Sequence, residues 1–278
     1  MVQESKTLNG RTVVITRPRA QAEATVREIE ERGGKPYLFP TIEIREIRDP
    51  LSTKAFFSAL SEKRVDYVLL MSVNGVKHLL SIADNTSFKD KLKATLNETV
   101  IIAVGPKTAQ ELEKNDIRVD MVPERYTSEG ILHCLKQRHV RGKTIYIPRT
   151  SEAPPELARK LREMGNIVEE IHVYQSQLPT DRELAGKFVS DLENNRIDAI
   201  IFSSSLGVRN FFEMLRGLVT ERKLTELISK ELVVVAIGPT TARTLEEAGV
   251  KVDLVPEKLT IDQALDMLAR YWNAGKTV

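Results

Sequence analysis

Residues 104–124 read VGPKTAQELEKNDIRVDMVPE, and residues 237–257 read IGPTTARTLEEAGVKVDLVPE. The two stretches are identical at 11 of 21 positions. Both contain Gly-Pro-x-Thr-Ala near the start, and both close on Val-Pro-Glu. Self-similarity at a fixed spacing indicates that one structural unit is used twice.

Two further blocks repeat in nearly the same register. Residues 10–17 (GRTVVITR) match residues 142–149 (GKTIYIPR), and residues 66–76 match residues 198–208. The offset is 132 residues for these blocks and 133 for the first pair. A generic strand–turn–helix texture would not hold one register across the chain. The sequence therefore predicts two similar halves.

Short apolar, β-branched runs alternate with segments of helical period. The expected strands are residues 12–16, 67–71, 100–104, 118–122, 144–147, 199–202, 232–237 and 251–255. The expected helices are residues 21–32, 75–82, 106–114, 128–137, 155–164, 208–215, 239–248 and 261–269. Strands that are apolar nearly throughout predict parallel sheets covered on both faces, and hence an α/β, doubly wound fold.

Composition excludes several classes of protein. Lys and Arg number 41 against 39 for Asp and Glu, a near-balance that argues against a dedicated nucleic-acid binder. The single cysteine, Cys134, cannot form an internal disulfide. The first residues, MVQESKTLNGR, offer no apolar stretch for a signal peptide, and no apolar run approaches a membrane span. We expect a cytoplasmic protein without membrane or nucleic-acid partners.

Polar residues follow the expected strands where ligands bind in α/β sheets, beyond the carboxyl ends. Arg17 and Arg149 each follow a strand, as do Ser72, Ser203 and Ser204. An arginine there can grip a carboxylate with its forked donors, although it can equally be an ordinary solvated side chain. Two similar halves predict a cleft between them, with these residues lining it.

The Gly-Pro turns can bind an anion. Gly105 and Gly238 each let the backbone turn closely before a proline that starts a helix. The N–H groups of Thr240 and Thr241 then lie at the positive end of the helix dipole beside two hydroxyls, and Thr108 occupies the equivalent turn of the other half. The alternative is that Gly-Pro is only a strand-to-helix turn and threonine a cap.

Familiar catalytic and cofactor motifs are missing from the sequence. It contains no GxxxxGK[ST], no GxGxxG and no GxSxG. His133, Cys134 and His139 do not have the spacing of a metal site. We therefore expect neither a metal nor a nucleotide cofactor.

Tyr174 lies in the extended stretch Ile171-His-Val-Tyr-Gln-Ser176, which leads from one half to the other. A tyrosine at such a junction can donate a proton into a cleft. It can equally be a packed residue whose hydroxyl is satisfied locally.

Taken together, the chain resembles the uroporphyrinogen-III synthase family. The matching stretches are Ile15-Thr-Arg-Pro18, Val173-Tyr-Gln175, Phe202-Ser203 and Ala236-Ile-Gly-Pro-Thr-Thr-Ala-Arg-Thr-Leu245. The resemblance implies two α/β domains, one formed by residues 1–40 with 179–278 and the other by residues 48–173. Residues 41–47 and 174–178 would pair as a two-stranded hinge. The duplication alone would suggest a single cut near residue 140.

The resemblance also implies an activity. The family cyclises hydroxymethylbilane, which carries eight carboxylates, to uroporphyrinogen III. Water is lost and ring D is inverted through a spiro intermediate, without metal or organic cofactor. By motif, Tyr174 matches the tyrosine that helps the hydroxyl leave, Ser203 a serine after a strand, and Thr240 with Thr241 the paired threonines.

Other expectations follow from the same resemblance. It implies a monomer that takes its substrate in a transient handover from hydroxymethylbilane synthase. After Ser72 this chain has Val73-Asn74, where many members carry a basic residue. The alternative function is a non-catalytic tetrapyrrole-binding or sensor module on the same fold. A periplasmic-type binding protein is disfavoured by the missing export signal.

Overall fold

The computed structural model describes residues 7–86 and 88–274 and divides into two compact units. Unit 1 comprises Met1–Glu43 with Gln177–Val278, and unit 2 comprises Ile44–Ser176. The predicted first domain also includes residues 1–6 and 275–278, which lie outside the described residues. The chain passes between the units twice, within strand β3 (Glu43–Glu46) and at the end of strand β7 (Ile167–Gln177).

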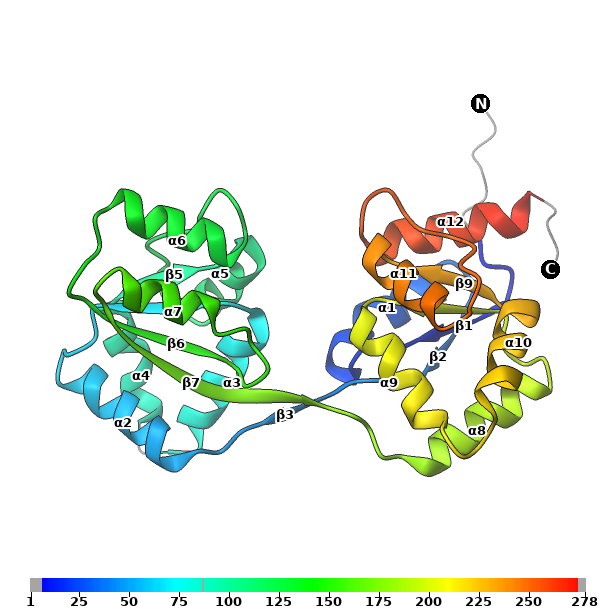
Figure 1. Cartoon of the computed structure of the whole chain (residues 1–278), viewed down its shortest axis with the longest axis horizontal. Coiled ribbons are helices and arrows are strands. Elements are labelled where there is room, and N and C mark those ends of the chain that lie inside the picture. The colour runs from blue at the N-terminus through cyan, green and yellow to red at the C-terminus, as the bar shows by residue number, and fades with distance from the viewer. Residues whose placement is uncertain (1–6, 87, 275–278) are drawn as a thin grey trace. The chain divides into compact units, whose positions relative to one another are not determined.

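Unit 1 is built on a parallel four-stranded sheet in the order β2-β1-β8-β9. The strands are β1 (Thr12–Ile15), β2 (Lys35–Leu38), β8 (Ala199–Phe202) and β9 (Val233–Ala236). The helices are α1 (Arg19–Glu31), α8 (Arg182–Glu193), α9 (Ser205–Leu215), α10 (Glu221–Glu231), α11 (Pro239–Glu247) and α12 (Ile261–Asn273). Helices cover both faces of the sheet (Figure 1).

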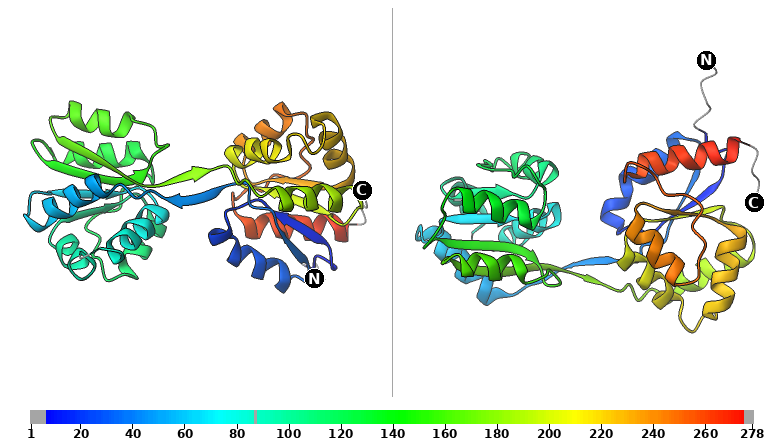
Figure 2. Two further views of the ribbon diagram at one scale, coloured as in Figure 1. Left: turned by 90° about the horizontal axis from the view of Figure 1, so that it is seen from below. Right: turned by 45° about the horizontal axis from the view of Figure 1, so that its top comes forward.

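Unit 2 contains a five-stranded sheet in the order β3-β7-β6-β4-β5, in which β7, β6, β4 and β5 are parallel. Its further strands are β4 (Tyr67–Leu70), β5 (Val100–Ala103) and β6 (Thr144–Thr150). Its helices are α2 (Pro50–Ser61), α3 (Val73–Asp84), α4 (Lys89–Asn97), α5 (Pro106–Glu113), α6 (Ser128–Gln137) and α7 (Glu156–Glu163). The turned views in Figure 2 show the helices on both faces of this sheet as well.

Side chains point alternately to the two faces of the sheet along each strand, which explains why helices cover both faces. On β4, Val68 and Leu70 join the apolar cluster under α2, α3, α4 and α5, whereas Leu69 points to the opposite cluster under α6 and α7. On β1, Val14 packs toward α8–α11, and Val13 packs toward α1 and α12. Because successive strand side chains face opposite ways, a fully apolar strand buries both faces. The predicted α/β fold with parallel sheets is confirmed.

Each unit takes strands from both sequence repeats. The strand order β2-β1-β8-β9 of unit 1 corresponds to β7-β6-β4-β5 of unit 2, because β1 aligns with β6 and β8 with β4. Figure 1 shows the consequence in unit 1, where the blue β1 and β2 share a sheet with β9 from the orange end of the chain. A single cut near residue 140 would separate the paired strands of both sheets.

In each sheet, one aspartate side chain joins the two central strands by a hydrogen bond, and we call this arrangement the aspartate clip. In unit 2, Asp66 Oδ2 accepts the backbone N–H of Thr144 at 2.8 Å, and in unit 1, Asp198 Oδ2 accepts the N–H of Thr12 at 2.7 Å. The return bonds are also equivalent, from the N–H of each aspartate to the carbonyl of its threonine at 3.0 Å. The repeat is therefore kept in detailed hydrogen bonding.

Two predicted strands are wrong. Within residues 118–122 and 251–255 the chain makes only isolated bridges, Ile102 with Met121 and Val235 with Leu254. Asp120 and Asp253 explain the difference, because their side chains take the N–H groups of Ile101 and Val234 at 2.9 and 3.0 Å. A side chain there bonds to an amide of the neighbouring strand, so regular pairing does not extend.

Two helices end at glycines, and two extended segments connect the units. Gly165 and Gly249 have φ angles of +86° and +78°, so a glycine in the left-handed conformation follows each of α7 and α11. Residues 41–47 and 174–178 were expected as paired connectors. Strands β3 and β7 are neighbours in one sheet, and the Ile47 N–H donates to the Val173 carbonyl at 3.1 Å. No helix among the described residues is both long and apolar enough to cross a bilayer.

The Asp66 clip gives a pH-dependent contribution to stability. Burial raises the pKa of Asp66, but the Thr144 amide and the Lys143 ammonium outweigh it, so that the pKa lies below its ordinary value of 3.8. We expect Asp66→Asn to lower the free energy of unfolding by about 1.5–3 kcal/mol at pH 7. This difference should shrink as the pH falls from 3.8 through the folded pKa, because the stabilising carboxylate becomes protonated.

Urea denaturation at pH 7 and at several acidic pH values measures both effects. Asp116→Asn is the matched control, because the Asp116 carboxylate makes an exposed ion pair with Lys93 and asparagine tolerates its positive φ of 61°. A difference that does not change with pH would contradict the assignment.

Candidate functional site

Unit 1 brings the start of α9 next to the start of α11. Ser204 caps α9 by accepting the Gly207 N–H at 3.1 Å. The next residue, Ser205, donates its hydroxyl to the Thr240 carbonyl at 3.2 Å and accepts from the Thr244 hydroxyl at 2.9 Å. The predicted residues Ser204 and Thr240 therefore lie together where β8 and β9 end.

The first turn of α11 leaves backbone donors available. Gly238 precedes the helix with extended backbone, and Pro239 has no N–H. The first helical bond runs from the Ala242 N–H to the Gly238 carbonyl at 3.0 Å. Within residues 7–86 and 88–274, no acceptor is found for the amides of Thr240 and Thr241. Two free amides at a helix N-terminus can bind an anion.

The two threonine hydroxyls differ. Thr240 is exposed, whereas Thr241 is 5% exposed and packs within the unit. The prediction that two hydroxyls flank the anion is corrected for Thr241, because its side chain is buried and only its amide is available. Ser203 is half-buried at the end of β8, directly before the cap of α9.

Unit 2 repeats this arrangement with altered chemistry. Ser72 caps α3 by accepting the Gly75 N–H at 3.0 Å, and Gly105 precedes α5 as Gly238 precedes α11. However, the Thr108 N–H already donates to the Gly105 carbonyl at 3.1 Å, and its side chain is buried. The expectation that Thr108 binds an anion is therefore corrected.

Lys107 is the residue that the sequence reasoning missed. It is exposed in the first turn of α5, at the position that Thr240 occupies in unit 1. A lysine is unfavourable at the positive end of a helix, and an anionic ligand would remove that conflict. The signal was present in the alignment of the two repeats, since Lys107 differs from Thr240 inside the repeated Gly-Pro-x-Thr-Ala. This cation lies in the unit that lacks a basic residue after Ser72.

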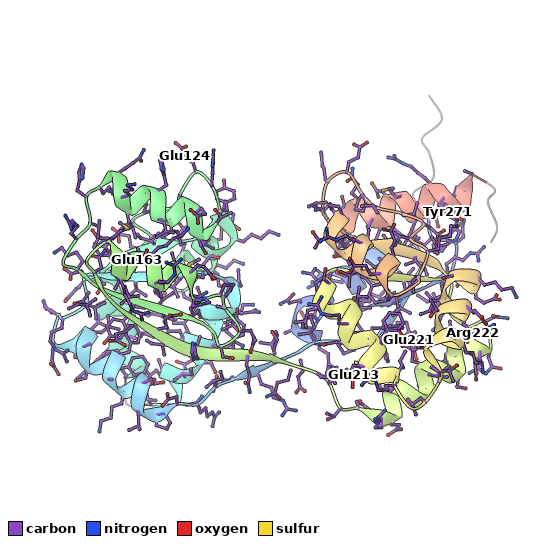
Figure 3. The ribbon with its side chains drawn as sticks, in the orientation of Figure 1. Glu124, Glu163, Glu213, Glu221, Arg222 and Tyr271 are labelled. Carbon is purple, nitrogen blue, oxygen red and sulfur yellow. The ribbon has the colours of Figure 1, made fainter. Side chains whose placement is uncertain are left out.

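Exposed apolar side chains stand beside both glycines. Tyr126 is 61% exposed and Leu259 is 60% exposed. A Cβ on Gly105 would meet the Tyr126 ring at 3.2 Å, and one on Gly238 would meet Leu259 at 3.7 Å. Glu124 belongs to the same loop as Tyr126, and Figure 3 labels it beyond the end of β5. Both turns thus combine polar backbone with an uncovered apolar group.

Tyr174 joins Ser72 in unit 2. The phenol oxygen lies 3.1 Å from Ser72 Oγ, and either oxygen can be the donor. The tyrosine is only 8% exposed and belongs to the apolar cluster under α2, α3, α4 and α5. These features match the packed-residue interpretation, yet they also hold the hydroxyl against a half-buried serine at the start of α3.

The two arginines that align in the repeat have different environments. Arg17 is half-buried, and Nη2 lies 3.4 Å from the Gln21 side chain. Arg149 is 5% exposed, pairs with Glu170 at 3.1 Å and donates to the Pro154 carbonyl. Because its guanidinium is held inside unit 2, the expectation that Arg149 grips a ligand carboxylate is corrected.

A cavity of about 570 Å³ in unit 2 contains none of the predicted site residues. Its lining includes Glu46, Arg48, Phe57, Ile82 and Phe88. Among the described residues, no three His, Cys, Asp or Glu side chains gather as ligands of a metal ion would.

Comparison with known proteins settles the family. The family model described as uroporphyrinogen-III synthase HemD matches residues 23–266. The chain belongs to the uroporphyrinogen-III synthase family. This family assignment favours an enzyme of tetrapyrrole biosynthesis over the non-catalytic binding module.

Relatives of similar length agree. The chain is 32% identical to a putative uroporphyrinogen-III synthase of Methanothermobacter thermautotrophicus over 92% of this chain and 97% of that protein. It is also 32% identical to a uroporphyrinogen-III synthase of Chlorobaculum parvum, over 89% and 93%. A solved uroporphyrinogen III synthase of Thermus thermophilus shares the fold, with a TM-score of 0.62, 23% identity and coverage of 95% and 99%.

Substitutions of Arg149 and Arg17 test whether Arg149 has a structural role. We expect Arg149→Ala to lower the free energy of unfolding by about 1.5–3 kcal/mol, because the Glu170 carboxylate loses a charge-assisted hydrogen bond and keeps Arg162 at 4.0 Å. Arg17→Ala, the matched variant in the other unit, should cost less than about 1 kcal/mol, since Arg17 makes no buried ion pair in the part of the chain described. Urea denaturation compares the two, and equal losses would contradict the structural role of Arg149.

Proposed function

We propose that this chain cyclises hydroxymethylbilane to uroporphyrinogen III, with loss of water and inversion of ring D, as a cofactor-independent hydro-lyase. The observation that carries the proposal is that a Gly-Pro helix start in each unit presents donors suited to an anion. In unit 1 it offers the free amides of Thr240 and Thr241, and in unit 2 it offers the ammonium of Lys107. A substrate with eight carboxylates suits such paired sites.

The two units would share the grip on the substrate. Charge-assisted hydrogen bonds contribute about 1.5–3 kcal/mol each, so a few amides and one cation can hold several carboxylates. In unit 1, Ser203 and Arg17 add donors at the ends of β8 and β1. The exposed Tyr126 and Leu259 offer apolar surface on which pyrrole rings can rest.

The chemical step would use Tyr174. As the carbon–oxygen bond of the hydroxymethyl group breaks, the phenol proton passes to the departing oxygen, which leaves as water and gives an azafulvene. The substituted carbon of ring D then attacks the azafulvene methylene on ring A, which gives the spiro intermediate. The bond from that carbon to the bridge of ring C breaks, and the free α-carbon of ring D bonds to the bridge instead, which inverts the ring. The proton that this α-carbon then loses restores the phenol. The Ser72 contact supports this role, because a serine hydroxyl that donates to the phenol oxygen leaves the phenol proton free.

Most of the acceleration would come from positioning. The bilane must fold so that its two ends meet, and holding them together converts an encounter into an intramolecular step. We further propose a cytoplasmic monomer that receives its substrate from hydroxymethylbilane synthase, as the family resemblance implies.

The products distinguish this enzyme from a binding module. When fresh hydroxymethylbilane is generated by a coupled deaminase, we expect the protein to yield the type III isomer above a no-protein control. Oxidation followed by chromatographic separation of the type I and type III uroporphyrins measures the ratio. The type I isomer forms spontaneously, so its exclusive formation would refute catalysis and favour the tetrapyrrole-binding alternative.

A further inference from the structure

The Tyr174 ring is stacked on an imidazole. Its centroid lies 5.4 Å from that of His78, and the ring planes are inclined by 25°. His78 belongs to α3, the helix that Ser72 caps. Because Ser72, Gly75 and His78 are spaced three residues apart, they lie along one side of the helix. One helix therefore supports both the hydroxyl and the ring of the tyrosine.

Strand β3 holds His78 from a second direction. Imidazole Nδ1 lies 3.8 Å from Oε2 of Glu46. Glu46 is itself fixed, since Arg48 Nε donates to Oε1 at 3.0 Å and Ser81, on α3, also bonds to the carboxylate. Burial raises the pKa of Glu46, but these hydrogen bonds outweigh it and keep the pKa below its ordinary value. The carboxylate is therefore an anion at neutral pH.

The imidazole, in contrast, is neutral. Burial lowers the pKa of His78 below its ordinary value of 6.5, and the nearby Glu46 offsets only part of this effect. At neutral pH the ring thus presents an uncharged aromatic face to Tyr174. Nδ1 lies 3.8 Å from the Glu46 carboxylate, so the edge of the imidazole has a polar neighbour while its face meets Tyr174.

We propose that His78, stacked on the Tyr174 ring with Glu46 beside it, is a positioning residue that fixes the direction of the Tyr174 hydroxyl for proton transfer. This inference rests on the proposed function, because it assigns His78 to the same step. A phenol is free to turn about two side-chain torsions, and contacts at the ring face and at the hydroxyl restrict both. Small displacements of a reacting group cost much rate, so a defined ring orientation matters for catalysis.

A packing role alone does not explain these groups. The core side of α3 is supplied by Val76, Leu79 and Ile82, all buried in the apolar cluster. His78 and Ser81 instead form a polar side that meets Glu46. Burying polar groups costs free energy that an aliphatic side chain would avoid. The arrangement is therefore suited to orienting Tyr174 and not only to filling space.

A double-mutant cycle tests whether His78 acts through Tyr174. We expect His78→Ala to lower kcat for type III formation by roughly two- to tenfold with KM unchanged. In the Tyr174→Phe background the same substitution should have no further effect on kcat, because the hydroxyl that it positions is gone. His78→Phe, which keeps an aromatic ring in place, should restore kcat to within about twofold of the wild type.

Controls separate this role from folding. His133→Ala removes an exposed histidine on α6 and should leave kcat and KM unchanged. Thermal unfolding of each variant ensures that the kinetics compare folded proteins. Equal losses of kcat in both backgrounds, or a raised KM with unchanged kcat, would overturn the proposal.

A second readout does not depend on catalysis. The near-ultraviolet circular dichroism of the wild type minus that of Tyr174→Phe reports how firmly the Tyr174 ring is held. The same difference, with and without Tyr174→Phe, is then taken in each His78 variant. We expect it to be mostly lost in the His78→Ala background and retained in the His78→Phe background. A signal unchanged in His78→Ala would refute the positioning role. Absence of type III product from the wild type would instead refute the proposed function.

Discussion

The carboxylates of Asp66 and Asp198 fasten the central strands of the two sheets, and the rest of each unit is arranged around that pairing. Each unit is assembled from two distant parts of the chain, and the clip lies where those parts meet, β4 against β6 and β8 against β1. Six residues after each aspartate comes a serine, Ser72 or Ser204, that caps the following helix. A fixed register at the start of the strand therefore fixes the helix start at its end.

The two units keep the same arrangement of strands and helices, but the residues where the strands end and the helices start differ. Both units present a capped helix beside a Gly-Pro helix start, with an exposed apolar side chain against the glycine. Unit 1 offers two free amides, whereas unit 2 offers a lysine and a tyrosine hydrogen-bonded to the capping serine. The division suits a reaction in which both units hold carboxylates and one unit also supplies a proton.

Much of the fold could be predicted from sequence because it depends on local signals. Apolar strands, proline at helix starts and glycine after helix ends are read directly from neighbouring residues. The repeat supplied the correspondence between the units. The exchange of strands between repeats could not be read in this way, because it depends on pairing between distant segments. The family resemblance, not the residue pattern, suggested a discontinuous division.

The site was predicted less completely, for physical reasons that particular residues illustrate. Arg149 lies on β6, which continues to Thr150, past the predicted end at residue 147. Because Arg149 is part of this longer strand, its guanidinium lies beside Glu170 of the neighbouring strand. Thr108 and Thr241 sit at helix positions that face the interior, which the motif does not reveal. The contacts of Tyr174 with Ser72 and His78 join segments about a hundred residues apart, so no local pattern contains them.

The central claim is that the helix start of each unit binds carboxylates of the tetrapyrrole, through the amides of Thr240 and Thr241 in unit 1 and through Lys107 in unit 2. Amide-resolved NMR titration of the full chain with uroporphyrinogen III, kept reduced, tests it most directly. The account predicts that the amide signals of Thr240 and Thr241 in unit 1 and of Lys107 in unit 2 shift together, with one common dissociation constant. Shifts confined to one unit, or limited to the cavity lined by Glu46 and Phe57, would contradict it.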